Sequence, residues 1–423
     1  MTKKSDAPAI RFKGFSDAWE QRKFDEVFDC TVPNNTLSRA ELSYDEGTVL
    51  NVHYGDVLIK YGSVLDVQKD DIPRIPHRCR ADFNGALLQD GDVIIADTAE
   101  DETTGKACEI GNLQGSAIVS GLHTMVCRPR NRMALGYLGY YLNSNAYHHQ
   151  LLPLMQGIKV LSLSRSNIQK TSVSYPIAVK EQQLIAYYFS QLDNLITLHQ
   201  RKFEKLTNVK KSMLEKMFPQ NGSSYPEIRF KGFTDPWEQR KLGDIADIVG
   251  GGTPSTGNQS YWDGDIDWYA PAEIADQIYA NSSQKKITGL GYENSSAKML
   301  PPGTVLFTSR AGIGKTAILT RKGCTNQGFQ SIVPHRGELD SYFIFSRTEE
   351  LKRYGELVGA GSTFVEVSGK QMAVMELMMP PTMREQQTIG GFFQQLDHLI
   401  TLHQRELEKL QNIKKSMLEK MFV

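Results

Sequence analysis

The sequence predicts an α+β protein in which two globular domains are joined by two long helices that form an antiparallel coiled coil with pseudo-twofold symmetry. Two internal repeats support this prediction. The segment from Glu181 to Phe218 returns almost unchanged from Glu385 to Phe422, and Pro8 to Val27 returns as Pro226 to Ile245. The stretches between these repeats differ strongly. Two copies of one plan with divergent middles therefore account for the 423 residues.

Each copy of the longer repeat is expected to form one continuous helix of about 55 Å. Apolar residues recur in it with gaps of four and three, the spacing of a coiled-coil seam. His199 and His403 occupy seam positions and are expected to fix the register. Lys210 and Lys414 interrupt the seam, which predicts a local slip there. The predicted seam consists of Ile185, Phe189, Leu192, Ile196, His199, Phe203, Leu206 and Met213, and of Ile389, Phe393, Leu396, Ile400, His403, Leu407, Leu410 and Met417.

The segment between the first helix and the second half is short and rich in turn residues, from Pro219 to Pro226. A parallel pairing of the helices would require the second half to bring the chain back over a full helix length. An antiparallel pairing needs only a short connection, so we expect an antiparallel pair with one globular domain at each end. The expected division is residues 1–177, first globular domain; 178–219, first helix; 220–226, linker; 227–381, second globular domain; and 382–423, second helix.

Strand-like runs and turn signals alternate in both middles. A Gly-rich loop, Gly250 to Gly252, opens the second middle. The predicted strands are Val57 to Lys60, Asp92 to Ala96, Thr124 to Arg128, Ile266 to Ala270, Thr304 to Thr308, Thr316 to Thr320 and Ser331 to Pro334. Helical segments are predicted at Leu135 to Leu152 and Ser341 to Leu357.

Composition limits the possible functions. The chain is 40% hydrophobic and 23% charged, and no apolar run is long enough to cross a bilayer. Its start has no signal-peptide pattern, and its five cysteines are scattered, so we expect a cytoplasmic protein with reduced thiols. The formal net charge is zero. Nucleic-acid binding would therefore need segregated charge or a partner that supplies part of the surface.

The motif from Ser309 to Thr316 ends like a phosphate-binding loop, but Ser309 stands where that loop requires glycine. The corresponding place in the first half, Asp97 to Lys106, also ends in Gly-Lys, which favours backbone or phosphate contact over hydrolysis. No zinc spacing or catalytic motif is present, so we expect no metal site and no catalytic residues. Two alternatives stay open: a coiled-coil scaffold that binds no DNA, and a nucleotide hydrolase using Lys315.

Basic and aromatic residues concentrate in the two middles, where loops could contact phosphates and base edges. Arg74, Lys285, Lys286 and Arg321 belong to this population. The candidate DNA-binding residues are Lys60, Tyr61, Arg78, Arg80, Lys106, Lys159 and Arg165 in the first middle, and Tyr261, Trp262, Trp268, Arg310 and Lys315 in the second.

The duplicated helix, with Glu-Gln-Gln at its start and Leu-Asp-x-Leu-Ile within it, resembles the specificity subunits of type I restriction-modification enzymes. The repeated Ile-Arg-Phe-x-Gly-Phe at Ile10 and Ile228, followed by Trp-Glu at Trp19 and Trp237, belongs to the same pattern. The resemblance covers essentially the whole chain. It implies that each middle is a target recognition domain reading one half of a bipartite, asymmetric sequence in double-stranded DNA.

The resemblance also implies partners. The helices would space the two domains and dock two modification subunits, which methylate adenine, while two restriction subunits add translocation and cleavage. S-adenosylmethionine, ATP and Mg²⁺ are expected on those partners, with no cofactor on this chain. DNA clamped jointly by several chains would reconcile the neutral charge with DNA binding.

Overall fold

The computed structural model describes residues 7–220, 222–274, 277–310, 312–360 and 366–423. The chain divides into two compact units. Unit 1 contains residues 1–200 and 405–423, and unit 2 contains residues 201–404. Each long helix is therefore shared, its first part belonging to one unit and its last part to the other. Among the described residues, no helix is long and apolar enough to span a membrane.

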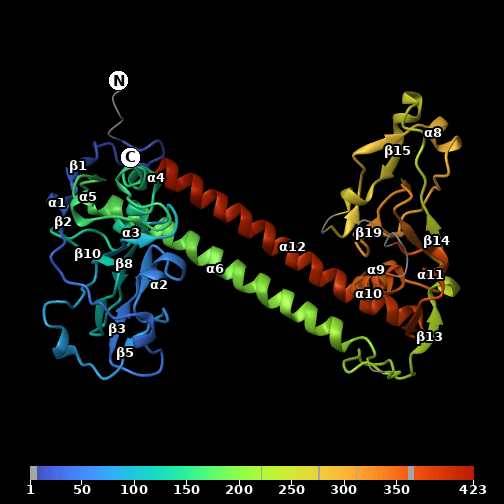
Figure 1. Cartoon of the computed structure of the whole chain (residues 1–423), viewed down its shortest axis with the longest axis horizontal. Helices are drawn as coiled ribbons and strands as arrows, with labels where there is room; N and C mark the ends of the chain where they lie inside the picture. Colours follow the sequence, from blue (N-terminus) through green and yellow to red (C-terminus); the bar gives the residue numbers. More distant parts are fainter. Residues whose placement is uncertain (1–6, 221, 275–276, 311, 361–365) are drawn as a thin grey trace. The chain divides into compact units, whose positions relative to one another are not determined.

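Unit 1 is an α+β unit whose strands and short helices precede the long helix α6, coloured green in Figure 1. Its strands are β1 (Glu20–Lys23), β2 (Phe28–Asp29), β3 (Val49–Val52), β4 (Val64–Asp66), β5 (Arg74–Ile75), β6 (Val93–Ala96), β7 (Thr98–Ala99), β8 (Ala107–Gly111), β9 (Ala117–Ser120), β10 (Thr124–Pro129), β11 (Leu161–Ser162) and β12 (Ser172–Tyr175). Its helices are α1 (Phe24–Val27), α2 (Tyr54–Ile59), α3 (Tyr137–Leu142), α4 (Asn145–His148), α5 (Arg165–Ile168) and α6 (Val179–Lys216), with 3₁₀ turns at Arg39–Glu41, Arg80–Phe83 and Leu152–Leu154.

Unit 2 repeats this plan before the second long helix, α12, which is red in Figure 1. Its strands are β13 (Glu238–Lys241), β14 (Ala246–Gly250), β15 (Trp262–Tyr269), β16 (Tyr279–Ala280), β17 (Lys285–Ile287), β18 (Val305–Phe307), β19 (Thr316–Leu319), β20 (Cys324–Thr325), β21 (Gln330–Pro334) and β22 (Glu376–Met379). Its helices are α7 (Leu242–Ile245), α8 (Gly289–Glu293), α9 (Ser341–Ser346), α10 (Thr348–Gly359), α11 (Gly369–Ala373) and α12 (Met383–Lys420), with 3₁₀ turns at Gln259–Tyr261 and Pro271–Glu273.

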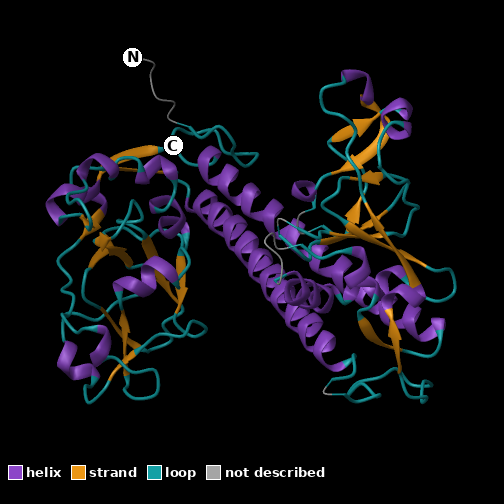
Figure 2. Ribbon diagram, turned by 45° about the vertical axis from the view of Figure 1, so that its right-hand side comes forward, coloured by secondary structure: helices purple, strands orange, loops and turns teal. Residues whose placement is uncertain are grey.

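The two units share one sheet topology despite their divergent sequences. Each has a five-stranded sheet, in the order β2-β10-β6-β8-β4 or β14-β21-β18-β19-β16, and a two-stranded ladder, β1-β12 or β13-β22. Each also has a three-stranded sheet, β5-β3-β9 or β17-β15-β20. Figure 2 shows these strands in orange with the short helices beside them. The internal repeat therefore extends through the middles, where side chains changed and strand order did not.

The long helices pair in opposite directions within each unit. In unit 1, Asp193 of α6 meets Lys414 of α12, and Phe189 of α6 stacks on Phe422, two residues after the end of α12. Residue numbers therefore fall along α6 as they rise along α12. In unit 2, Lys210 meets Asp397 and Phe218 stacks on Phe393. The antiparallel pairing predicted from the short linker is confirmed inside each unit.

All predicted seam residues are buried or half-buried. A slip of the seam was predicted at Lys210 and Lys414. There the neighbouring apolar residues, Val209 and Ile413, pack against the cores of their units. Phe422 closes the core of unit 1 against Trp19, Tyr141 and Phe189. Burial of one such ring contributes roughly 1.5–3 kcal/mol.

The repeated opening segment clamps the start of one long helix and the end of the other. In unit 1, Arg11 donates two hydrogen bonds of 2.6 and 2.8 Å to the buried carboxylate of Glu181, to which Trp19 donates a third. The Ile10 N–H also donates to the carbonyl of Lys420 at the end of α12, 2.9 Å away.

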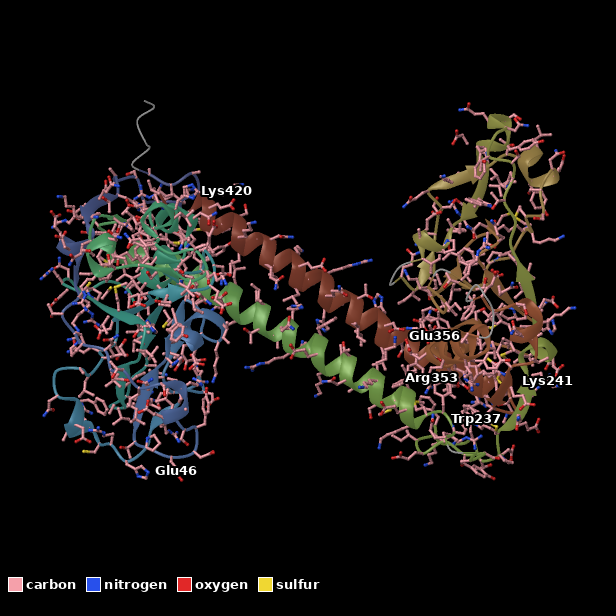
Figure 3. The ribbon with its side chains drawn as sticks, in the orientation of Figure 1. Glu46, Trp237, Lys241, Arg353, Glu356 and Lys420 are labelled. Atoms are coloured by element: carbon pink, nitrogen blue, oxygen red, sulfur yellow. The ribbon has the colours of Figure 1, made fainter. Side chains whose placement is uncertain are left out.

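Unit 2 repeats the clamp with Arg229, Trp237 and Glu385. The Ile228 N–H donates to Lys216, the last residue of α6, again at 2.9 Å. Figure 3 labels Trp237 in unit 2 and Lys420 at the end of α12. The retained opening segment thus serves to join the two long helices to each globular part.

Three predicted elements were wrong in detail. One is the helix predicted from Ser341 to Leu357, which is divided at Arg347 into α9 and α10. Val57 to Lys60 was expected to be a strand but lies largely in α2, because the His53 side chain accepts a hydrogen bond from the Gly55 N–H and starts a helix there. The helix predicted from Leu135 to Leu152 is broken into α3, α4 and a 3₁₀ turn. The break occurs at Asn143, whose side chain bonds the backbone of Ala107 on β8 instead of continuing the helix.

Candidate nucleic-acid interface

The three-stranded sheets place basic and aromatic side chains together at equivalent positions of the two units. In each, the central strand, β3 or β15, is antiparallel to a short strand that carries cations and parallel to the third strand. The short strand is β5, with Arg74, in unit 1 and β17, with Lys285 and Lys286, in unit 2. These cations are visible in the sequence, but their position on equivalent sheets is visible only in the structure.

In unit 1 three cations contact Tyr44, two of them at its half-exposed ring and one at its backbone carbonyl. Arg39 donates to the Tyr44 hydroxyl at 2.7 Å, and Lys60 lies 3.3 Å from the hydroxyl and 4.6 Å from the ring centroid. Arg74 donates to the Tyr44 carbonyl at 3.3 Å. A cation this close to an aromatic face is stabilised by the ring, so the cluster holds positive charge at the surface.

We call Tyr44, Arg39, Lys60 and Arg74 the Tyr44 cluster. Carboxylates neutralise only part of its positive charge. Arg39 pairs with Asp56 at 2.5 Å, and Lys60 pairs with Asp71 at 2.9 Å. Among the described residues, Arg74, Arg78 and Arg80 form no ion pair; Arg80 donates to the carbonyl of Gly115. Arg74 of the cluster, and Arg78 and Arg80 after it in the chain, are therefore available to an external anion.

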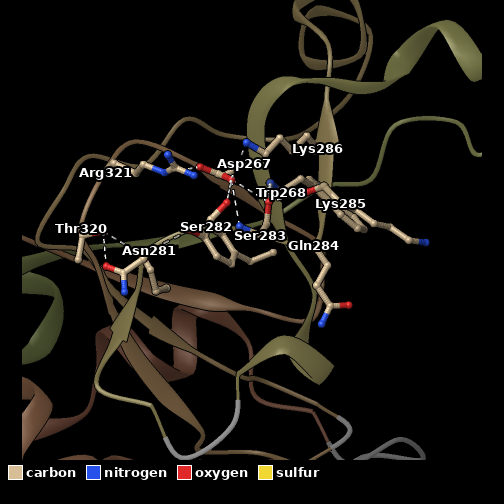
Figure 4. A network of polar contacts seen from close by, with 12 residues as sticks. Asp267, Trp268, Asn281, Ser282, Ser283, Gln284, Lys285, Lys286, Thr320 and Arg321 are labelled. Atoms are coloured by element: carbon tan, nitrogen blue, oxygen red, sulfur yellow. Dashed lines mark hydrogen bonds and ion pairs between the residues drawn. The ribbon is translucent and has the colours of Figure 1, made fainter.

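Unit 2 builds its cluster on one buried carboxylate, Asp267, which is 3% exposed (Figure 4). Arg321 approaches it to 2.6 Å and Lys286 to 3.7 Å. The Ser283 N–H and hydroxyl donate to it at 3.0 and 3.1 Å, and the Ser282 hydroxyl donates at 3.2 Å.

Burial alone would raise the pKa of Asp267, but the hydrogen bonds from Ser283 and the charges of Arg321 and Lys286 outweigh it and hold the pKa below its usual value. The carboxylate thus stays ionised and orients two cations that keep exposed surface. Lys285 on the same strand lies 6.0 Å from the ring of Trp262. We call Lys285, Lys286, Arg321 and Trp262 the Asp267 cluster.

The Gly-rich loop contacts this cluster through Trp268, which packs on Trp262 of the cluster. Trp268 packs edge-to-face on Trp262 at 5.1 Å and donates its indole N–H to the Gly252 carbonyl at 2.8 Å. A side chain at position 252 would meet the backbone of Ala297 at 2.4 Å, so only glycine allows this close approach. The loop therefore holds an aromatic pair in place, and its glycines have a packing role.

The predicted DNA-binding residues fall into three groups. Tyr61 and Trp268 are core residues, 3% and 6% exposed, and the prediction that they face DNA does not agree with their burial. Lys106 points inward and donates to the Leu58 carbonyl at 2.7 Å, and burial lowers its pKa. The exposed or half-exposed residues are Lys60, Arg78, Arg80, Lys159, Arg165, Tyr261, Trp262, Arg310 and Lys315.

The two Gly-Lys loops occupy equivalent places, as predicted, because they connect β6 to β8 and β18 to β19. Gly105 and Gly314 have φ angles of +90° and +94° there. Lys315 leads directly into strand β19. A nucleotide phosphate-binding loop instead leads into a helix whose N-terminus holds the phosphate, so this loop is not built for nucleotide hydrolysis.

Tyr44, Arg39 and Asp267 were missed at the sequence level. Arg39, in a 3₁₀ turn, and Tyr44 lie where the sequence predicts no element. Asp267 lies in a predicted strand, where an acid gives no sign of pairing with Arg321. The roles of Arg11 and Glu181 were missed as well, although their repetition as Arg229 and Glu385 was a usable signal. Among the described residues, no group of three or more His, Cys, Asp or Glu could hold a metal ion.

Comparison with known proteins gives one consistent result. The family described as type I restriction modification DNA specificity domain matches twice, at residues 17–208 and 234–412. Over 190 residues the chain is 34% identical to the type I restriction enzyme MjaIX specificity subunit of Methanocaldococcus jannaschii, an alignment covering 44% of each chain. It is 24% identical to the putative MjaX specificity subunit of that organism over 95% of this chain and 92% of that one.

A solved structure shares the fold. It is the crystal structure of the type I restriction-modification system S subunit from M. genitalium, with 12% sequence identity, a TM-score of 0.62 and 99% of each chain covered. At this identity the match concerns the fold, and it extends over both units and both long helices.

Proposed function

The chain belongs to the family of type I restriction-modification DNA specificity subunits, and on this premise we propose that unit 1 and unit 2 each read one half of a bipartite, asymmetric DNA sequence. The chain is the DNA-specificity component of such a system and not its catalytic component. One observation carries the proposal: equivalent three-stranded sheets present different aromatic and basic groups in the two units. A shared scaffold with different contact residues suits the recognition of two different sequences.

The chemistry of the two clusters fits DNA. Exposed lysine and arginine side chains neutralise phosphates, and arginine also recognises base edges through two parallel hydrogen bonds. The Tyr44 cluster offers Arg74, and the exposed Arg78 and Arg80 follow it in the chain. The Asp267 cluster offers Lys285, Lys286 and Arg321. This segregation supports DNA binding by a chain whose formal net charge is zero.

The partner subunits are part of the proposal. Large apolar side chains remain exposed on the long helices, namely Tyr187, Leu195 and Leu198 on α6 and Leu399 and Leu402 on α12. Exposed apolar residues at helical spacing are typical of surfaces that bind another protein. We propose that two modification subunits dock there, that two restriction subunits join them in the cytoplasm, and that S-adenosylmethionine, ATP and Mg²⁺ bind to these partners.

The test is to co-express the chain with its modification subunit and map methylated adenines in the host genome. A bipartite motif with two different halves is expected. A single continuous motif, or no sequence preference, would overturn the proposal.

A second measurement tests the clusters. Lys286→Met should weaken DNA binding by the complex and reduce the slope of log affinity against log salt by about one, the value for one lost phosphate contact. Lys231→Met is the matched control, since Lys231 is exposed in the opening segment of the same unit, outside the sheet. Equal effects of both changes would exclude the Asp267 cluster as a DNA contact.

A further inference from the structure

A tyrosine, an aspartate and a lysine connect three helices in unit 1. The hydroxyl of Tyr140 on α3 donates to Asp193 Oδ2 on α6 at 2.8 Å. The other carboxylate oxygen, Oδ1, forms an ion pair with the ammonium group of Lys414 on α12, 2.5 Å away. The globular part of unit 1 is thus bonded to one long helix, and through the same carboxylate to the other.

Unit 2 contains the same arrangement, atom for atom. The hydroxyl of Tyr342 on α9 donates to Asp397 Oδ2 on α12 at 2.9 Å, and Lys210 on α6 lies 2.6 Å from Asp397 Oδ1. The aspartate side chains are 31% exposed in unit 1 and 8% in unit 2, and both lysines are about one-quarter to one-third exposed. The globular parts diverged, yet both retained a tyrosine that reaches this carboxylate.

These contacts fix the register of the helix pairing, which the apolar seam alone does not fix. Hydrophobic contact is non-directional, and a heptad pattern repeats, so the seam alone accepts several levels of pairing. A partly buried charge pair tolerates one level only, because a shifted register leaves a desolvated charge without its partner. The hydrogen bond from the tyrosine also fixes how the globular part is rotated about the helix pair.

We propose that Asp193 and Asp397 are positioning residues that set the number of unread base pairs between the two half-sites. Successive base pairs lie about 3.4 Å apart and turn by about a tenth of a full circle, so a small shift of a recognition unit brings it to the wrong base pair. This inference rests on the proposed function, since it concerns how the two halves of a bipartite site are kept at one separation.

The experiment maps methylated adenines genome-wide for the complex of full-length chain and modification subunit. With Asp193→Asn, methylation at sites whose spacer is one base pair longer or shorter should rise at least about twofold over wild type, the lower end of the effect of uncoupling contacting charged residues. The sequences of the half-sites should stay unchanged. The exchange Asp193→Lys with Lys414→Asp rebuilds an ion pair and should return the spacer distribution toward wild type.

Controls separate positioning from general damage. Lys415→Met changes the neighbouring exposed lysine, which forms no ion pair among the described residues, and should leave the spacer distribution unchanged. If Asp193→Asn abolishes methylation, Tyr140→Phe and Lys414→Met decide by the same readout, since both leave the carboxylate in place. A strict wild-type spacer in these variants, or relaxation by Lys415→Met, would refute the inference. Absence of a bipartite motif in the wild type would instead refute the proposed function.

Discussion

Glu109 is a buried carboxyl group on β8, which lies between β6 and β4 in the five-stranded sheet of unit 1, and it offers a quantitative test of the fold. It is 1% exposed, and its Oε2 accepts a hydrogen bond from the Gly139 N–H at 2.8 Å, in the first turn of α3. Burial raises its pKa from an ordinary 4.5 to about 7, and the backbone hydrogen bonds from α3 only partly oppose this.

The sign of the pH effect follows from this shift. Between about pH 4.5 and 7 the folded unit retains a proton that the unfolded chain has lost, so stability falls as the pH rises through this window. The difference between the two pKa values corresponds to roughly 3 kcal/mol, lost fully above about pH 7. Unit 2 has Ile318 at the equivalent sheet position, paired with Val305 and Tyr279, and provides an internal control.

The assay is amide hydrogen exchange followed by mass spectrometry between pH 5 and 8, corrected for intrinsic exchange rates. Peptides from β6 and β8 should lose protection as the pH rises, whereas those from β18 and β19 should not. Glu109→Gln keeps an acceptor for α3 but cannot ionise, so it should abolish the pH dependence in unit 1. An unchanged pH dependence in this variant would show that another group is responsible.

Two further predictions concern the retained segments. Arg11→Met leaves the carboxylate of Glu181 buried and unpaired and should destabilise unit 1 by roughly 3–5 kcal/mol, measured as increased exchange of unit 1 peptides. Gly390→Ala should destabilise unit 2, because its Cβ would lie 2.6 Å from Asp340 Oδ1, whereas Gly391→Ala, with nothing within 4 Å, should stabilise α12 by up to about 1 kcal/mol, both measured by thermal unfolding.

Matched variants guard both results. Lys13→Met, at an exposed lysine two residues from Arg11, should leave exchange unchanged. Arg229→Met should produce the same loss in unit 2 that Arg11→Met produces in unit 1, because the clamps have the same geometry. Loss of protection in both units from Arg11→Met alone would contradict a local clamp, and equal effects of the two alanine substitutions would contradict the steric argument.

The sequence was sufficient for the helices and the repeat because their signals are local and periodic. The predicted helices start within two residues of Val179 and Met383. The strand predicted from Asp92 contains β6, and the strand predicted from Thr124 covers β10 except for its last residue, Pro129. Prediction failed where a distant partner decides the structure. Asn143 ends a helix because β8 lies beside it, which no local pattern could show.

The same limit applies to the candidate interface. Three cations meet at Tyr44 although they come from a 3₁₀ turn, the end of α2 and β5. Residue type made Tyr61 a candidate and left Tyr44 out, yet Tyr61 fills the core. Composition could therefore indicate which chemistry is present, and the sheet topology was needed to show which side chains share a surface.

The two identical clamps carry a consequence for folding. Arg11 binds Glu181, but Glu385 presents the same carboxylate, and nothing in the chemistry of the clamp distinguishes them. Arg11 precedes Glu181 by 170 residues and Glu385 by 374 (385 minus 11). Closing the longer loop costs only about 0.7 kcal/mol more, too little to ensure one outcome.

The order of synthesis determines whether Arg11 pairs with Glu181 or with Glu385, which the difference in loop-closure free energy does not. Glu181 leaves the ribosome long before Glu385 exists, so Arg11 meets a single acceptor, and Arg229 later finds only Glu385 vacant. Refolding of the complete chain from denaturant removes this order. It should yield a fraction of crossed molecules in which the opening segment of one unit occupies the clamp of the other.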